Sequence, residues 1–106
     1  GHTGIMEAAV KAIETLDICV PKIVDAVLAK DGQILLTADH GNADCMVDKA
    51  GNVVTAHSLN PVPLVHIAKN PVNLADGGKL CDIAPTMLRL MGLSIPEEMT
   101  GKSLIK

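Results

Sequence analysis

The residues of this sequence best suited to chemistry are a carboxylate and two imidazoles on two short segments. Asp39 and His40 are adjacent in the segment TADHGNAD, and His57 follows downstream in TAHSLNP. A carboxylate oxygen beside imidazole nitrogens suits manganese or zinc better than calcium, which prefers oxygen ligands alone. The pattern therefore indicates divalent-metal chemistry.

Length and composition limit what can surround these residues. The chain has 106 residues, which is enough for one small domain or for part of a larger one. Hydrophobic residues make up 48% of it and no aromatic residue is present, so any core consists of aliphatic side chains and methionine. The net charge of −3 supplies no basic surface. We therefore expect no nucleic acid and no anionic membrane among the partners.

The cysteines indicate a reducing compartment. Cys19, Cys45 and Cys81 are odd in number and widely spaced, so neither a disulfide framework nor a thiolate zinc site is implied. No apolar run approaches the roughly 20 residues that a membrane-spanning helix needs, and no secretory signal is visible. We expect a cytoplasmic protein without a membrane segment.

Two helices are expected before the metal-binding motif. Apolar residues recur at intervals of three and four over residues 4–16, which predicts an amphipathic helix with Thr3 as its N-cap. Pro21 fits the first turn of a second helix, which Asp31-Gly32 would end.

A strand is expected to present the motif. Residues 33–38 are short and apolar and lead into Asp39, which predicts a buried parallel strand with its polar residues at the carboxyl edge of a sheet. The stretch 39–63 is largely irregular, apart from a possible very short strand at 53–55, and long irregular segments are usually functional.

The last third of the chain is expected to contain a strand, a helix and a final docking segment. Residues 64–68 are predicted to form the strand, and residues 82–91 the helix, with Asp82 as its cap and Pro85 in its first turn. Residues 104–105 are predicted to be a last strand or a tail that packs on the body.

Several segments of the chain follow one another in a distinctive order: GHTG, AAVKAIETLD, TADHGNAD, TAHSLNPVPLV, GGKLCDIAPTMLRLMGL and PEEMTGKSL. In this order they resemble the carboxyl end of the cofactor-independent (2,3-bisphosphoglycerate-independent) phosphoglycerate mutases of the alkaline phosphatase superfamily. Each motif alone is weak evidence, but their shared order and spacing leave little room for chance.

The resemblance implies an α/β fold, with a partial alkaline-phosphatase-like sheet flanked by helices. Residues 1–106 would be the C-terminal part of the discontinuous metal-binding phosphatase domain. Members of this family interconvert 3-phosphoglycerate and 2-phosphoglycerate through a phosphoserine intermediate at a two-metal centre, usually manganese (Mn²⁺). Two cations suit this reaction because phosphoryl transfer spreads negative charge over several oxygens.

The resemblance also implies a ligand set. Asp39 and His40 match the ligands of the metal that touches the nucleophilic serine, and His2 and His57 match ligands of the second metal. The family's serine, its remaining ligands and its substrate-gripping basic residues lie upstream, so no catalytic residue is expected in this chain. We expect the chain alone to be inactive and to self-associate through uncovered apolar faces.

Other interpretations remain open at this point. The parent could be another phosphotransferase or phosphatase of the same superfamily, or the chain could be a non-catalytic metal-binding module that stands alone. His2 could belong to an expression-tag remnant, and Asn42 could either orient neighbouring ligands or simply form a turn. His66 fits an ordinary strand position.

Overall fold

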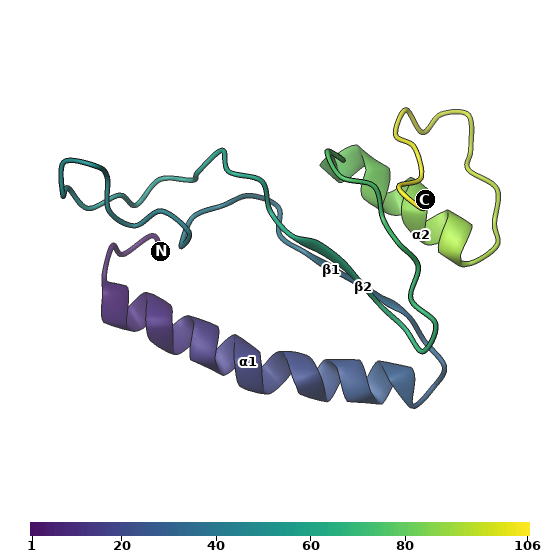
Figure 1. The fold of residues 1–106 in the computed structure, drawn as a ribbon, viewed down its shortest axis with the longest axis horizontal. Helices are drawn as coiled ribbons and strands as arrows, with labels where there is room; N and C mark the ends of the chain where they lie inside the picture. The colour runs from purple at the N-terminus through teal and green to yellow at the C-terminus, as the bar shows by residue number, and fades with distance from the viewer.

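The computed structural model describes residues 1–106, and it has two α-helices, a two-stranded sheet and long irregular connections (Figure 1). In chain order the elements are α1 (Met6–Leu28), β1 (Ile34–Thr37), β2 (Leu64–Ile67), the short 3₁₀ helix η1 (Leu80–Asp82) and α2 (Ile83–Leu90). The chain is thus a small α/β structure, as predicted. Its two-stranded sheet is smaller than the predicted sheet flanked by helices. No helix combines the length and the apolar content that crossing a bilayer requires.

Helix α1 corrects the prediction of two helices, because it runs without interruption through Pro21. A proline inside a helix removes one backbone hydrogen bond but keeps a helical φ, so the helix can continue at a cost. The apolar face also continues past the proline, at Ile23, Val24 and Val27, so nothing in the pattern stops the helix. The predicted Thr3 cap is wrong: Ile5 occupies the N-cap position and no side chain caps the first turn. The Thr3 hydroxyl instead accepts from the Ile5 N–H over 3.4 Å, just before the helix begins.

The two strands are where the sequence predicts them, but they are antiparallel. Ile34 pairs with Ile67 and Thr37 with Leu64. The predicted parallel strand is therefore wrong for this pair. A parallel partner needs a crossover, usually a helix, whereas residues 38–63 form an irregular excursion that returns beside the strand it left. Neither strand is fully buried.

The predicted short strand at 53–55 is reduced to a single bridge between Val47 and Val53. The excursion is held together instead by side-chain hydrogen bonds and by a second bridge, between Gly41 and Ser58. Both candidate metal-binding motifs lie on this excursion, which Figure 1 shows extending beyond the strands.

The best-packed part of the molecule lies around α2, with Pro85 in its first turn as predicted. Thr86 is fully buried, and its hydroxyl donates to the Asp82 carbonyl (2.7 Å) and accepts from the Leu104 N–H (3.0 Å). Residues 104–105 do dock on the body, through a bridge between Leu74 and Ile105. Asp82 occupies the N-cap position, but its carboxylate accepts from the N–H groups of Lys79 and Lys102, both at 2.8 Å, instead of capping α2.

The hydrophobic core is very small for a chain of this length. Its buried members are only Ala9, Met46 and Leu104. The accessible surface is 7834 Å², against about 5,600 Å² expected for a compact protein of 11.0 kDa. The radius of gyration is 16.6 Å, against about 13 Å for a compact chain of similar length. Much apolar surface is therefore left without a partner within this chain.

Candidate metal centre

The structure brings the three predicted histidines together at the excursion, near the bridge between Gly41 and Ser58. The Ser58 N–H donates to the Gly41 carbonyl over 2.8 Å, and this bridge sets the residue after His40 beside the residue after His57. His2 reaches the same place from the turn that precedes α1, and its ring nitrogen Nδ1 lies 3.3 Å from the Thr55 carbonyl.

His40 and His57 stack face to face. Their ring centroids are 3.4 Å apart and their planes differ by 15°. The lone pairs of an imidazole lie in the plane of its ring, so two parallel rings at this spacing cannot direct lone pairs at one cation. This pair is suited to serve two different cations, one on each ring.

His2 and His57 have a different relationship, with centroids 5.2 Å apart and planes tilted by 55°. Two imidazoles that bind one tetrahedral ion through nitrogens at about 2.1 Å have centroids about 5 Å apart. The spacing of His2 and His57 is compatible with one shared ion.

Asp39 and His40 form a second compatible pair. Asp39 Oδ2 lies 3.6 Å from His40 Nε2, and two donor atoms on one tetrahedral ion are separated by about 3.4 Å. The Asp39 side chain is 80% exposed and that of His40 is 34% exposed, so both remain accessible from solvent. The Asp39 carboxylate also accepts from the His40 N–H over 3.1 Å, which fixes its orientation relative to the ring.

Backbone carbonyls select the tautomer of two of these rings. His40 Nδ1 lies 3.1 Å from the Gly41 carbonyl and His2 Nδ1 lies 3.3 Å from the Thr55 carbonyl. A carbonyl oxygen can only accept, so Nδ1 carries a proton in each ring, and in the neutral imidazole this leaves the lone pair on Nε2. This arrangement is usual for histidines that bind metals through Nε2.

The donors are chemically suited to a divalent cation, but no closed site is present. No group of three or more His, Cys, Asp or Glu side chains is arranged to hold one ion. The chain therefore offers two pairs of donors, and each pair needs further ligands from elsewhere to complete a metal site.

The two motif segments are tied together by side chains that the sequence analysis did not single out. Asp44 accepts from Ser58 Oγ (2.8 Å to Oδ2 and 3.1 Å to Oδ1) and from Asn60 Nδ2 (2.6 Å). These bonds hold the pKa of the Asp44 carboxyl below its usual value, and the bond from Asn60 has a larger effect than the bond from Ser58. No periodicity in the sequence reports such contacts, because they join two irregular segments.

Asn42, whose role was open, makes contacts across the two segments. Its Nδ2 donates to the carbonyls of Thr55 (3.2 Å) and Ala56 (3.1 Å), the two residues before His57. These contacts give its side chain a role beyond forming a local turn.

His66 is a structural residue. It is 9% exposed, accepts the Val72 N–H at Nδ1 (3.0 Å) and therefore donates from Nε2 to Gln33 Oε1 (2.8 Å). Both ring nitrogens are satisfied, so neither has a lone pair to offer a ligand.

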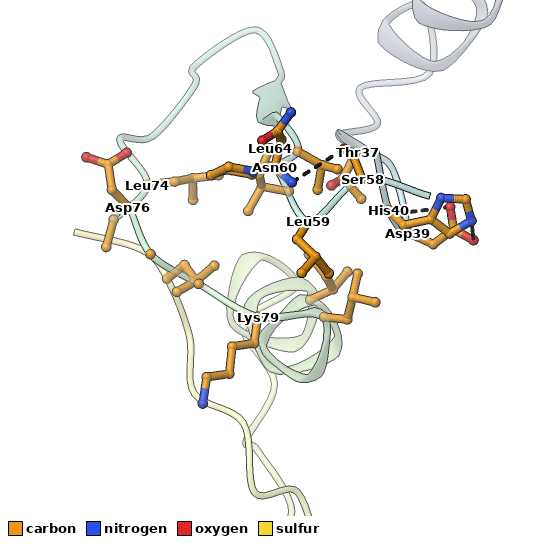
Figure 2. A pocket seen from close by; sticks show the side chains of 18 residues that line it. Thr37, Asp39, His40, Ser58, Leu59, Asn60, Leu64, Leu74, Asp76 and Lys79 are labelled. Atoms are coloured by element: carbon orange, nitrogen blue, oxygen red, sulfur yellow. Dashed lines mark hydrogen bonds and ion pairs between the residues drawn. The ribbon is translucent and has the colours of Figure 1, made fainter. Parts of the chain in front are cut away.

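A cavity of about 650 Å³ adjoins the candidate centre. Figure 2 shows Asp39 and His40 side by side at one end of it, with Asp76 and Lys79 at the other end of the view. This volume falls in the range of small-molecule sites.

Comparisons with known proteins identify the family of this chain. The family model of the metalloenzyme superfamily matches residues 1–95. The 2,3-bisphosphoglycerate-independent phosphoglycerate mutase of Clostridium botulinum (strain ATCC 19397 / Type A) is 61% identical over 107 residues, covering 100% of this chain and 21% of the relative. Those of Serratia proteamaculans (strain 568) and Escherichia coli (strain K12) are 62% and 59% identical over 105 residues, covering 98% of this chain and 20% of each relative.

The chain thus spans about a fifth of the length of the curated relatives it matches. The resemblance predicted from the motifs is confirmed. This chain belongs to the metalloenzyme superfamily, and its whole length is similar to one part of the 2,3-bisphosphoglycerate-independent phosphoglycerate mutases.

Proposed function

We propose that this chain is the metal-liganding segment of a phosphoglycerate mutase that interconverts 3-phosphoglycerate and 2-phosphoglycerate through a phosphoserine intermediate. It would form part of the enzyme's metal-binding phosphatase domain and act in the cytoplasm, where its three free cysteines stay reduced. The observation that carries the proposal is the face-to-face stack of His40 on His57, with Asp39 beside one ring and His2 beside the other.

The proposed ligands divide into two pairs, for two Mn²⁺ ions. Asp39 and His40 would hold one ion, and His2 and His57 the other. The stacked rings support this division because they cannot serve a single cation, whereas the spacing within each pair is compatible with a shared ion. When bound, two cations lower the energy of the charge that develops on the phosphoryl oxygens.

The residues of this chain would place donors and orient them. The Gly41 and Thr55 carbonyls accept from Nδ1 of His40 and His2, which leaves Nε2 as the ring atom that would bind metal in each neutral imidazole. The chain supplies neither a serine nucleophile matching the family's motif nor a closed ligand set. It is therefore proposed to be inactive alone.

A hybrid enzyme tests the proposal. The corresponding segment of the Escherichia coli relative is replaced by this chain, and interconversion of the two phosphoglycerates is measured in an enzyme-coupled assay. We expect the hybrid to be active, its Asp39→Ala and His57→Ala variants to lose activity, and the 106-residue chain alone to show no turnover. Turnover by the chain alone, or full activity of both variants, would refute the proposal.

Calorimetric titration with MnCl₂ tests the ligand assignment on the chain itself. Each ion is expected to bind weakly, with Asp39→Ala and His57→Ala each lowering the affinity of one ion at least about tenfold, since a pair loses half its donors. Asp48→Asn is the control, because the Asp48 carboxylate bonds only within its own turn, to residues 50 and 52.

We further propose that the isolated chain self-associates through α1. Ala9 is the only buried residue of this helix, and its apolar face is open at Ile13 (55% exposed), Leu16 (54%) and Ile23 (60%). The excess surface of roughly 2,200 Å² over a compact protein is comparable with the 1,200 to 2,000 Å² or so that a stable interface buries. A second copy of α1 provides a matching apolar face.

A further inference from the structure

Hydrogen bonds across the excursion form a clamp, by which we mean Asn42 and Asp44 together with the groups they bind. Asp44 bonds the side chains of Ser58 and Asn60, on the downstream side of His57. Asn42 bonds the carbonyls of Thr55 and Ala56, on its upstream side. The backbone is therefore held immediately before and after the histidine.

Two glycines leave the space that the clamp needs. A Cβ at Gly41 would lie 2.1 Å from Ser58 Oγ and 2.8 Å from Asp44 Oδ1, so a side chain there would disrupt the Asp44 to Ser58 hydrogen bond. A Cβ at Gly1 would lie 1.4 Å from Asn42 Oδ1. The amide of Asn42 thus lies directly against the turn that carries His2.

The clamp also connects His2 with His57. The Thr55 carbonyl lies within hydrogen-bond distance of both Asn42 Nδ2 (3.2 Å) and His2 Nδ1 (3.3 Å). One carbonyl therefore fixes the His2 tautomer while it is itself held by Asn42, so a shift of this carbonyl would move both rings of the pair.

We infer that Asn42 and Asp44 are positioning residues that hold the His57 ring over His40 and beside His2. This inference rests on the proposed function, in which the two rings bind metal. His57 is exposed, and no regular helix or strand includes residues 38–63, so apart from the single bridge between Gly41 and Ser58 no backbone ladder fixes its place. Without the clamp the chain would have to order this loop on binding, which costs conformational entropy.

The clamp acts through geometry and not through its charge. Five hydrogen bonds join Asn42 and Asp44 to the downstream segment. Their partners there are the Ser58 and Asn60 side chains and the Thr55 and Ala56 carbonyls, and none of them is an imidazole. Replacing Asn42 by leucine therefore removes two bonds with no change in charge. Asp44→Asn weakens the other half of the clamp, and Asp48→Asn, outside the clamp, makes the same charge change.

The test uses two measurements on the 106-residue chain. The first is NMR of the histidine side chains without metal, where the stacked ring of each histidine shifts the carbon-bound protons of the other upfield; His40→Ala and His57→Ala assign the signals. The second is calorimetric titration with MnCl₂ of Asn42→Leu, Asp44→Asn, His57→Ala and Asp48→Asn.

We expect Asn42→Leu and Asp44→Asn to move the His40 and His57 signals toward those of an unstacked imidazole. They should also lower the affinity of the ion bound by His57 about 10- to 100-fold, the usual effect of losing groups that orient a ligand. Asp48→Asn should change neither measurement.

Three results would overturn the inference. One is that both clamp variants leave the histidine signals unchanged, whatever the affinity does. Another is that Asp48→Asn matches their effect, and the third is that both variants lose signal dispersion over the whole chain. If His57→Ala itself leaves Mn²⁺ affinity intact, the ligand assignment is wrong. If His57→Ala lowers the affinity but the clamp variants do not change the histidine signals, the ligand assignment stands and only the positioning role is wrong.

Discussion

At the scale of single residues, two polar groups near the start of α2 organise the best-packed part of the chain. The Thr86 hydroxyl connects the Asp82 carbonyl to the Leu104 N–H, and the Asp82 carboxylate connects the N–H groups of Lys79 and Lys102. Each group joins α2 to the last residues of the chain. With so few buried apolar side chains available, these bonds are a main means of holding that segment in place.

Replacing Thr86 by valine keeps the volume but removes the hydroxyl. The buried Leu104 N–H then has no acceptor, and we expect the free energy of unfolding to fall by about 1 to 3 kcal/mol in urea denaturation followed by circular dichroism. Thr86→Ser keeps the hydroxyl and should cost only about 0.8 kcal/mol, for one lost methyl group. Equal losses for the two variants would show that the hydroxyl does not stabilise this contact.

Asp82 predicts a pH dependence. The N–H groups of Lys102 and Lys79 lower the pKa of its carboxyl from the ordinary value of 3.8. A carboxyl with a lowered pKa in the folded state stabilises that state above its unfolded pKa, and this stabilisation is lost as the pH falls through the lowered folded value. Stability measured from pH 6 downward should thus decline below about pH 4, and Asp82→Asn should make the decline shallower. An unchanged slope in the variant would contradict this assignment.

At the scale of elements, α1 shows why a helix face can be predicted better than helix ends. The spacing of apolar residues defines the face from residue 5 to residue 27 whether or not a proline intervenes. Pro21 by itself is equally compatible with a position in the first turn of a new helix and with a position inside one longer helix. Only the structure distinguishes these two cases.

Pro21→Ala should make α1 more helical. Alanine restores the backbone N–H at this position and removes the ring that crowds the preceding turn, a difference of about 3 kcal/mol in a helix interior. Mean residue ellipticity at 222 nm should become more negative, and this signal should be lost at a higher temperature than in the parent chain. Lys22→Ala serves as the comparison, because it changes an exposed neighbour without altering the backbone, and an equal gain there would exclude the proline as the cause.

The same limit applies to the sheet and to the candidate site. The apolar segments 34–37 and 64–67 could be located from composition, but their relative direction depends on the path of the excursion between them, which has no periodic pattern. Asp39, His40 and His57 were identifiable from residue type and motif resemblance. The Asp44 bonds were not, because an aspartate, a serine and an asparagine in irregular segments look like ordinary loop residues.

At the scale of the whole molecule, the chain has more surface than its own core can cover. Figure 1 shows α1 running along one side, with the strands and α2 on the other, and α1 buries only Ala9. Relatives about five times as long have additional segments available to cover such a face. In the isolated chain, only other copies of the same chain can cover this face.

Self-association should therefore depend on the apolar face of α1. In sedimentation velocity at several concentrations, we expect dimers or larger species, and Ile13→Glu should shift the population toward monomer at least about tenfold in the dissociation constant, since it places a charge in an apolar contact. Thr15→Glu adds the same charge near the same turn on the polar face and should leave association unchanged. A monomeric parent chain, or equal effects of the two variants, would contradict this view.

The Asp44 clamp has a consequence for how such sequences can diverge. Positions 44, 58 and 60 share one set of hydrogen bonds although they lie in separate motifs, so we expect a replacement at one of them to be harmful until another compensates for it. Natural variants of this segment should exchange these residues jointly, with a lost acid at 44 accompanied by a new pairing at 58 and 60.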